Sequence, residues 1–197
     1  MNPRIPLSLK SKIVSAEKAA ETISDGMTLA MSGYAMAGYP KAIPEELVKR
    51  KKAGQELNLN LITGANVPWL DELLGSEEII SARAPMCASR VLSSQANSGK
   101  VRYAEQQMCK MPRLLRSHSF GEIDMLVVEA LGMTEEGLIP TTSVGFTNYL
   151  MDAAKEIIVE INQAQPEALF GLHDIYIPEP PPDTAPIPLT DCRDRMG

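Results

Sequence analysis

Residues 124–130 (DMLVVEA) form an almost wholly apolar run. Such a run is typical of a β-strand that is covered on both faces. Shorter apolar runs predict further strands at 27–32, 57–62 and 157–161, and the strand at 157–161 is also expected to be buried. Weaker strands are predicted at 79–82 and 101–103. Because helical patterns separate several of these strands, we predict an α/β fold with an open, mostly parallel sheet flanked by helices.

Three segments, one before the first strand and two between strands, have the pattern of helices. Ser15 is a suitable N-cap for the first of them. The second follows a glycine-rich turn at 33–39 and has Pro40 and Pro44 near its start, where the missing N–H of proline is harmless. The third is expected over 147–155. The buried face of the second helix is expected to hold Ile43, Leu47 and Val48.

The chain changes character near residue 177. Prolines crowd the segment that follows too densely for a helix or a central strand. We therefore predict an α/β domain over residues 1–176 and an extended segment over 177–197 that leads to a carboxy-terminal domain. Since no closing element follows the prolines before Gly197, we expect the complete protein to be longer.

Composition narrows the class of protein. With 197 residues, 44% of them hydrophobic, the chain is long enough to bury a core without disulfides or metals. Its net charge of -6 argues against nucleic acid as a partner, because nucleic-acid binders present a basic face. The first residues lack a signal-peptide pattern and no apolar run approaches the length of a membrane span. We therefore expect a cytoplasmic protein with no membrane partner.

The sequence has no metal-binding pattern. The three cysteines, Cys87, Cys109 and Cys192, are widely spaced, and His118 and His173 are the only histidines. We expect reduced, structural thiols and no bound metal.

Three strand ends carry turns of small residues that include glycine. These turns are at 32–38, 63–66 and 141–145. Ligands of open α/β sheets bind at the carboxyl ends of the strands, and glycine there lets the backbone approach a ligand. A helix that starts directly after the first turn adds a partial positive charge that favours an anion. The turns therefore predict a site for a carboxylate or phosphate, with a purely structural role as the alternative.

Candidate catalytic side chains are few. Glu129 and Glu160 end apolar strands, where catalytic groups often lie, but a carboxylate bonded to a neighbouring helix or loop is the simpler interpretation. His173 and Asp174 are adjacent, so in an extended chain they point to opposite sides and form no dyad. Ser143 has no obvious histidine partner. The scattered arginines are expected on the surface or against a partner domain: Arg83, Arg90, Arg102, Arg113 and Arg116.

Five segments resemble blocks of a known family. In chain order they are 27–41 (MTLAMSGYAMAGYPK), 61–65 (LITGA), 140–145 (PTTSVG), 157–162 (IIVEIN) and 171–176 (GLHDIY), the last followed by the proline tract. They resemble the acetyl-CoA hydrolase/transferase family, which includes acetate, succinate and 4-hydroxybutyrate CoA-transferases. The blocks are spread along most of the chain and stand in the order of the family.

The resemblance implies a fold of the NagB/RpiA/CoA-transferase type and a protein of two related halves, of which this is the amino-terminal one. Family members move CoA between an acyl-CoA and a small carboxylate through a glutamyl-CoA thioester. Their nucleophilic glutamate lies in the carboxy-terminal half, so the resemblance implies no catalytic residue in this chain. It also implies a homodimer in the full enzyme, acyl-CoA as substrate and no permanently bound cofactor.

The same resemblance gives the three turns a role in shaping the pocket for substrate and CoA. The pocket residues so implied are Gly33, Gly38, Gly64, Ala65, Asn66, Ser143, Val144 and Gly145. The chain departs from the family pattern at Asn66, where a small hydroxyl residue is common, and at Phe146, where Asn is common. These departures leave the preference for a particular carboxylate open.

Two other functions are considered. A stand-alone binding or regulatory module that kept the fold and lost the chemistry would bind ligand without turnover and would show no large bare apolar face. A sugar-phosphate isomerase of similar fold would need its own base and a basic phosphate site, and the sequence shows neither.

Overall fold

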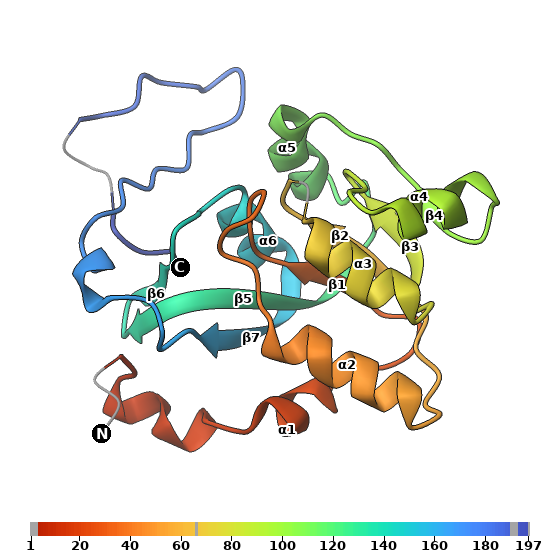
Figure 1. Cartoon of the computed structure of the whole chain (residues 1–197). Coiled ribbons are helices and arrows are strands. Elements are labelled where there is room, and N and C mark those ends of the chain that lie inside the picture. The colour runs from red at the N-terminus through yellow and green to blue at the C-terminus, as the bar shows by residue number, and fades with distance from the viewer. Residues whose placement is uncertain (1–3, 66, 190–192, 197) are drawn as a thin grey trace.

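The computed structural model describes residues 4–65, 67–189 and 193–196 (Figure 1). Its strands are β1 (Thr28–Met31), β2 (Leu59–Thr63), β3 (Ile80–Ala84), β4 (Arg102–Tyr103), β5 (Ile123–Thr134), β6 (Gly137–Pro140) and β7 (Ala154–Ile161). Its α-helices are α1 (Ala16–Ala20), α2 (Ala42–Lys52), α3 (Pro68–Ser76), α4 (Arg90–Asn97), α5 (Met111–Arg116) and α6 (Thr147–Ala153). Short 3₁₀ helices are η1 (Leu7–Lys12), η2 (Met108–Lys110) and η3 (Glu167–Leu169).

The strands form one mixed sheet in the order β4-β3-β2-β1-β5-β6, with β7 paired to β5. Neighbouring strands are parallel throughout, except that β6 runs antiparallel to β5 as the second strand of a hairpin. The predicted open, mostly parallel sheet is therefore confirmed. The strand β5 is central to it, because it contacts β1, β6 and β7.

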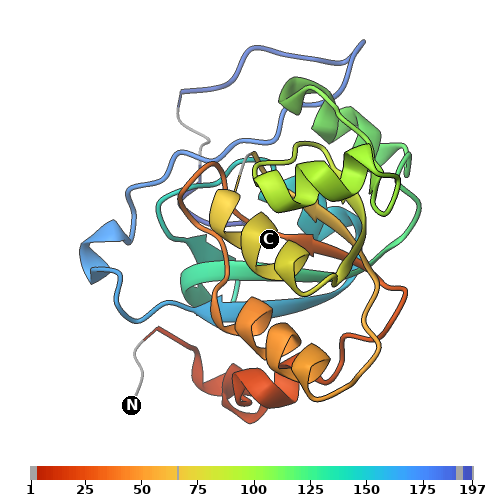
Figure 2. The same cartoon turned by 45° about the vertical axis from the view of Figure 1, so that its right-hand side comes forward.

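Helices cover both faces of this sheet (Figures 1 and 2). On one face, α1 to α4 contribute to an apolar cluster that includes Leu47 and the β5 residue Val127. On the other face, α5 and α6 contribute to a second cluster that includes Leu115 and the next β5 residue, Val128. Successive side chains of a strand point to opposite faces, so a strand that is covered on both faces is apolar at nearly every position.

Local sequence signals explain where the first helices begin. The Ser15 hydroxyl accepts a hydrogen bond from the backbone N–H of Lys18 at 3.2 Å and caps α1, as predicted. Pro44 lies in the first turn of α2. The N–H groups of a first turn have no acceptor within the helix, so proline loses no hydrogen bond there. The predicted inner face of α2 is confirmed, because Ile43, Leu47 and Val48 are all buried.

The prediction of a buried strand at 157–161 is wrong in one respect. Among the described strands β7 pairs only with β5, and Ile157 is 40% exposed. The run has the composition of a central strand, but the described residues supply no neighbour for its outer edge.

The segment after η3 leaves the sheet and returns to it (Figure 1). Between residues 170 and 189 it contains no helix or paired strand. Its return is fixed by a bridge between Ile175 and Arg193 and by another between Leu138 of β6 and Met196. Since Met196 is buried in the second apolar cluster, the last described residues are anchored on the sheet.

None of the helices in the described part of the chain is both long and apolar enough to cross a membrane.

Candidate functional site

The structure brings the three predicted turns together at one end of the sheet. A Cβ atom on Gly64 would overlap the carbonyl oxygen of Gly33, and one on Gly38 would overlap the hydroxyl of Ser143. The Ser143 hydroxyl also donates to the carbonyl oxygen of Ala37 at 3.0 Å. The backbones approach this closely because the glycines carry no side chain.

The remaining pocket candidates lie in the same turns. Gly145 has a φ of +54°, in the left-handed region, and a Cβ there would lie 3.6 Å from the carbonyl oxygen of Gly33. Ala65 is buried, and Val144 packs against the second apolar cluster. Asn66 lies outside the described residues, so its predicted role remains a prediction. We call this end of the sheet, formed by residues 32–41, 63–65, 129, 141–145 and 160–162, the strand-end region.

Glu129 is the buried centre of the strand-end region, with 3% of its surface exposed. Its Oε1 accepts hydrogen bonds from Lys41 Nζ at 2.8 Å and from Asn162 Nδ2 at 2.5 Å. Its Oε2 accepts from Thr141 Oγ1 at 3.0 Å. A buried carboxylate requires such donors, because burial removes its hydrogen bonds to water. Glu129 therefore ties the loops that follow β1, β6 and β7 to the middle of β5. The expectation that Glu129 ends its strand is wrong, because β5 continues to Thr134 and pairs there with β6.

Ser32 closes the first turn from inside. Its hydroxyl donates to the carbonyl oxygen of Gly38 at 2.7 Å and accepts from the backbone N–H of Glu129 at 2.9 Å. His173 approaches the same region from the carboxy-terminal segment, and its Nε2 lies 2.9 Å from the carbonyl oxygen of Thr141. These contacts hold the backbone in place, in keeping with the simpler interpretation of Glu129 as a carboxylate bonded to neighbouring loops.

Glu160 occupies the start of α2. Its carboxylate accepts hydrogen bonds from the backbone N–H groups of Lys41 at 2.8 Å, Ala42 at 3.0 Å and Ile43 at 3.2 Å. The sequence predicted that this helix start would attract an anion. The anion is supplied by the chain itself, so these three N–H groups are already bonded without a ligand.

The interpretation of Arg83 as a surface or partner-domain residue is wrong. Arg83 and Asp71 are fully buried and form an ion pair, with 2.8 Å between Nε and Oδ1. Arg83 Nη2 also donates to the hydroxyl of Thr63 at 2.7 Å, directly before Gly64, and Asp71 Oδ2 accepts from the N–H of Ala88 at 2.7 Å. Through Thr63, the pair therefore supports the turn at 63–65 of the strand-end region. The other scattered arginines are exposed, as expected: Arg90, Arg102, Arg113 and Arg116.

Sequence reasoning missed the partners of Glu129, which are Lys41, Thr141 and Asn162. Each of them follows closely on a strand that ends beside β5 or on the turn after such a strand. Position at a strand end was therefore the signal that could have grouped them.

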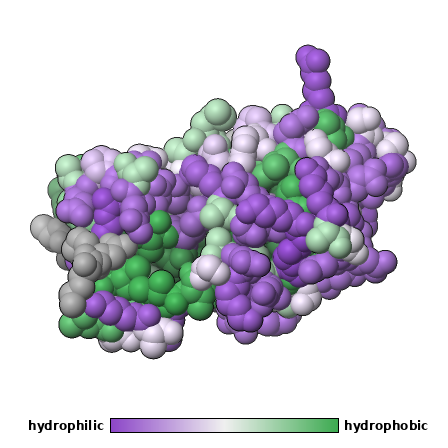
Figure 3. Space-filling model, turned by 60° about the horizontal axis from the view of Figure 1, so that its bottom comes forward, coloured by the Kyte–Doolittle hydropathy of each residue, from purple (hydrophilic) through white to green (hydrophobic). Residues whose placement is uncertain are grey.

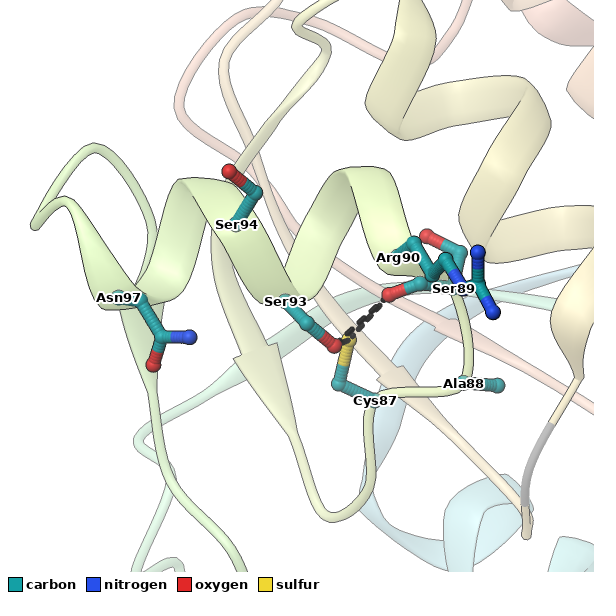
Figure 4. A pocket seen from close by; sticks show the side chains of 7 residues that line it. All are labelled: Cys87, Ala88, Ser89, Arg90, Ser93, Ser94 and Asn97. Atoms are coloured by element: carbon teal, nitrogen blue, oxygen red, sulfur yellow. Dashed lines mark hydrogen bonds between the residues drawn. The ribbon is translucent and has the colours of Figure 1, made fainter.

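A shallow hollow of about 380 Å³ lies at the start of α4 (Figure 4). Its lining includes Cys87, whose Sγ lies 3.4 Å from Ser93 Oγ and 3.7 Å from the carbonyl oxygen of Ser89. These contacts fit a structural thiol. Cys87 and Cys109 are both free, and Cys192 lies outside the described residues. Within residues 4–65, 67–189 and 193–196, no three His, Cys, Asp or Glu side chains group as a metal site.

Comparison with known proteins identifies the family. Residues 8–190 match the acetyl-CoA hydrolase/transferase N-terminal domain. Because this match covers most of the chain, the protein belongs to the acetyl-CoA hydrolase/transferase family.

Two curated relatives show the extent of the similarity. The chain is 35% identical over 194 residues to the succinyl-CoA:acetate CoA-transferase of Clostridium kluyveri, covering 97% of this chain and 36% of that enzyme. It is 30% identical over 190 residues to the propanoyl-CoA:succinate CoA transferase of Escherichia coli, covering 93% of this chain and 39% of that enzyme. The chain thus spans well under half the length of these relatives.

The fold is also that of a solved structure, RipA from Yersinia pestis. The two superpose with a TM-score of 0.66 at 19% sequence identity, over 81% of this chain and 38% of RipA. This likeness confirms the α/β fold.

Proposed function

We propose that this chain is the amino-terminal domain of a CoA-transferase that moves CoA between an acyl-CoA and a small carboxylate. The contact among the three glycine-containing turns carries the proposal, because it forms one compact backbone surface at the strand ends of a chain that belongs to this family. The names of the two curated relatives support acyl-CoA and carboxylate as substrate classes. The proposed pocket residues are those that the sequence singled out: Gly33, Gly38, Gly64, Ala65, Asn66, Ser143, Val144 and Gly145.

In this proposal the nucleophile comes from the carboxy-terminal part of the protein. A glutamate there attacks the thioester carbonyl and CoA leaves as thiolate, giving an acyl-glutamyl anhydride. The thiolate then attacks the glutamyl carbonyl and releases the first carboxylate, and a second carboxylate collects CoA by the reverse steps. CoA is thus a substrate, no resident cofactor is required, and the full enzyme is a cytoplasmic homodimer.

The two prominent carboxylates of this chain are poorly suited to that attack. Both oxygens of Glu129 accept hydrogen bonds inside the protein, and the carboxylate of Glu160 is held by the first N–H groups of α2. Each would have to break these bonds and expose an oxygen before it could reach a thioester. Their role in the proposal is to hold the turns, while residues 177–197 connect the domain to the rest of the enzyme.

The test is an exchange assay with acetyl-CoA and a labelled carboxylate. The 197-residue chain alone is expected to show no exchange. A chimaera in which the chain replaces its matched portion of the Clostridium kluyveri enzyme is expected to be active. Sustained exchange by the isolated chain would show that it contains a nucleophile, and a folded but inactive chimaera would argue against the proposed function.

A further inference from the structure

A large apolar groove lies between the N-terminal segment and the edge of the sheet. It has a volume of about 820 Å³ and is bordered by η1, α1, β7 and the β5–β6 hairpin. Aliphatic side chains dominate its lining, among them Ile13, Val14, Met133, Ile157 and Ile161. Figure 3 brings this side of the molecule forward and shows a broad hydrophobic area in a hollow of its surface. A continuous exposed apolar area of this kind marks an interaction surface.

The strand β7 borders the groove with an open edge. Among the described strands it pairs only with β5, so the backbone groups on its outer edge have no strand partner. Charges usually protect such an edge, but two of those on β7 are engaged inside the chain. Lys155 pairs with Asp124 at 2.8 Å, and Glu160 holds the start of α2, while the third, Glu156, is exposed and lines the groove. The groove therefore presents open backbone and apolar side chains together.

We propose that this groove is the docking surface for the carboxy-terminal part of the same protein, an inference that rests on the proposed function. The chain spans only 36% and 39% of the two curated relatives, so most of their length lies in polypeptide that could cover it. Interfaces between permanently joined parts are more apolar than transient ones, which fits this lining. Another polypeptide segment can also pair with the open edge of β7, which a small apolar molecule cannot do.

The end of the described chain lies beside this groove. Leu138 lines the groove, and its backbone exchanges two hydrogen bonds of 2.7 Å with Met196. Polypeptide that continues from this point therefore begins at the rim of the groove.

The groove also adjoins the strand-end region. Glu160 and Ile43 belong to its lining, and the Glu160 carboxylate bonds the start of α2 behind the first turn. Polypeptide seated in the groove is thus held next to the turns. This position fits a partner that supplies the nucleophile better than a second copy of this chain, which has none to supply in the proposed function.

The test compares amide hydrogen exchange in the isolated chain and in the Clostridium kluyveri chimaera. We expect residues 155–161 to exchange at least about tenfold more slowly in the chimaera, because opening of β7 then requires release of the docked segment. Residues 95–103, which include β4 at the opposite edge of the sheet, serve as the internal control and are expected to exchange equally in both proteins.

Two substitutions at equally exposed positions test whether the effect is specific to the groove. Ile157→Glu on β7 and Tyr103→Glu on β4 change side chains that are each 40% exposed, on opposite edge strands. In the chimaera, Ile157→Glu is expected to restore fast exchange at 155–161 and to lower CoA-transfer activity about tenfold or more, because it places a charge in an apolar interface. Tyr103→Glu is expected to change neither. Val14→Glu, on the opposite wall of the groove, provides a second variant with the expected behaviour of Ile157→Glu.

The readouts distinguish this inference from the proposed function. An active chimaera whose residues 155–161 still exchange rapidly would overturn the docking surface and leave the proposed function standing. Protection of 155–161 in an inactive chimaera would support docking and count against the proposed function. If the isolated chain forms a dimer by light scattering that Val14→Glu abolishes, a second copy is the occupant and the inference is overturned.

Discussion

The strand-end region and the groove differ in whether their polar groups have hydrogen-bond partners within this chain. In the strand-end region, Glu129 and Glu160 find their hydrogen-bond donors within this chain. Along the groove, the outer edge of β7 stays open and the walls are apolar. The chain therefore completes the framework of its proposed pocket and leaves one edge of its sheet to be covered, as the docking inference requires.

The largest expected effect concerns the buried Arg83–Asp71 ion pair, which bonds Thr63 of the strand-end region. Arg83→Ala leaves Asp71 buried without its partner, and breaking such a pair is expected to lower the free energy of unfolding by about 3–5 kcal/mol. Urea unfolding followed by circular dichroism measures the loss. The matched control is Arg102→Ala on the neighbouring strand β4, whose exposed side chain is expected to contribute little.

A double variant sharpens this prediction. Asp71→Leu combined with Arg83→Met removes both charges and fills similar volume, so it is expected to recover much of the stability that Arg83→Ala loses. Equal losses in the single and double variants would show that the pair acts through shape instead of charge.

The second expected effect concerns Glu129. Glu129→Ala deprives Thr141 and Asn162 of their acceptor in a buried setting, and is expected to lower the free energy of unfolding by about 2–3 kcal/mol. Glu129→Gln keeps the shape and an amide acceptor, so it is expected to lose about half as much. Thermal unfolding of the two variants checks the order, and an equally stable Glu129→Ala protein would mean that the network does not hold the turns.

Much of this contrast follows from local sequence, and part of it does not. The strands β1, β2 and β5 are visible as apolar runs, and the turns meet because they follow elements that adjoin in one sheet. The burial of Arg83 was not predictable from its neighbours, because its partner Asp71 lies on α3, a helix that the sequence pattern did not indicate. Which residues satisfy a buried charge is decided by the packing of elements.

The exposed edge of β7 shows the same limit. Its residues have a composition that predicts burial, and only the absence of a neighbouring strand among the described residues makes it an edge. The strand β6 was missed for a different reason. It has only four residues and ends in proline, so it gives almost no periodic signal.

A smaller, pH-dependent effect is expected at the start of β7. The hydrogen bond from Lys155 lowers the pKa of Asp124 below its ordinary value, and a second bond from the N–H of Thr28 adds to this. A carboxyl whose folded pKa is lowered stabilises the fold fully above its unfolded pKa of about 4, and this contribution disappears as the pH falls through the folded pKa.

Asp124→Asn is therefore expected to be less stable than the parent near pH 7. The two proteins are expected to converge only as the pH falls from about 4 through the lowered folded pKa of Asp124. Urea midpoints measured from pH 7 to pH 2 check this. A difference that stays constant over the whole range would exclude titration of Asp124 as its cause.

The smallest expected effect is within the groove itself. Ile157→Thr keeps a β-branched side chain at an exposed position, so it is expected to change the free energy of unfolding of the isolated chain by less than about 0.5 kcal/mol. Its register partner on β5, Leu126, is fully buried. Leu126→Ala is expected to cost about 2–5 kcal/mol in the same urea experiment. Similar losses at both positions would erase the contrast between core and groove.

The side chains around Glu129 also have a consequence for charge. Lys41 faces the carboxylate of Glu129, while the carboxylate of Glu160 lies on the adjacent N–H groups, so this network holds one cation and two anions. Lys41 Nζ already donates to Glu129 and to the carbonyl oxygen of Tyr39, which leaves it a single N–H. The side chains of this network therefore offer no surplus positive charge to an incoming organic acid. The positive charge that attracts the acid would then have to come from groups outside this network.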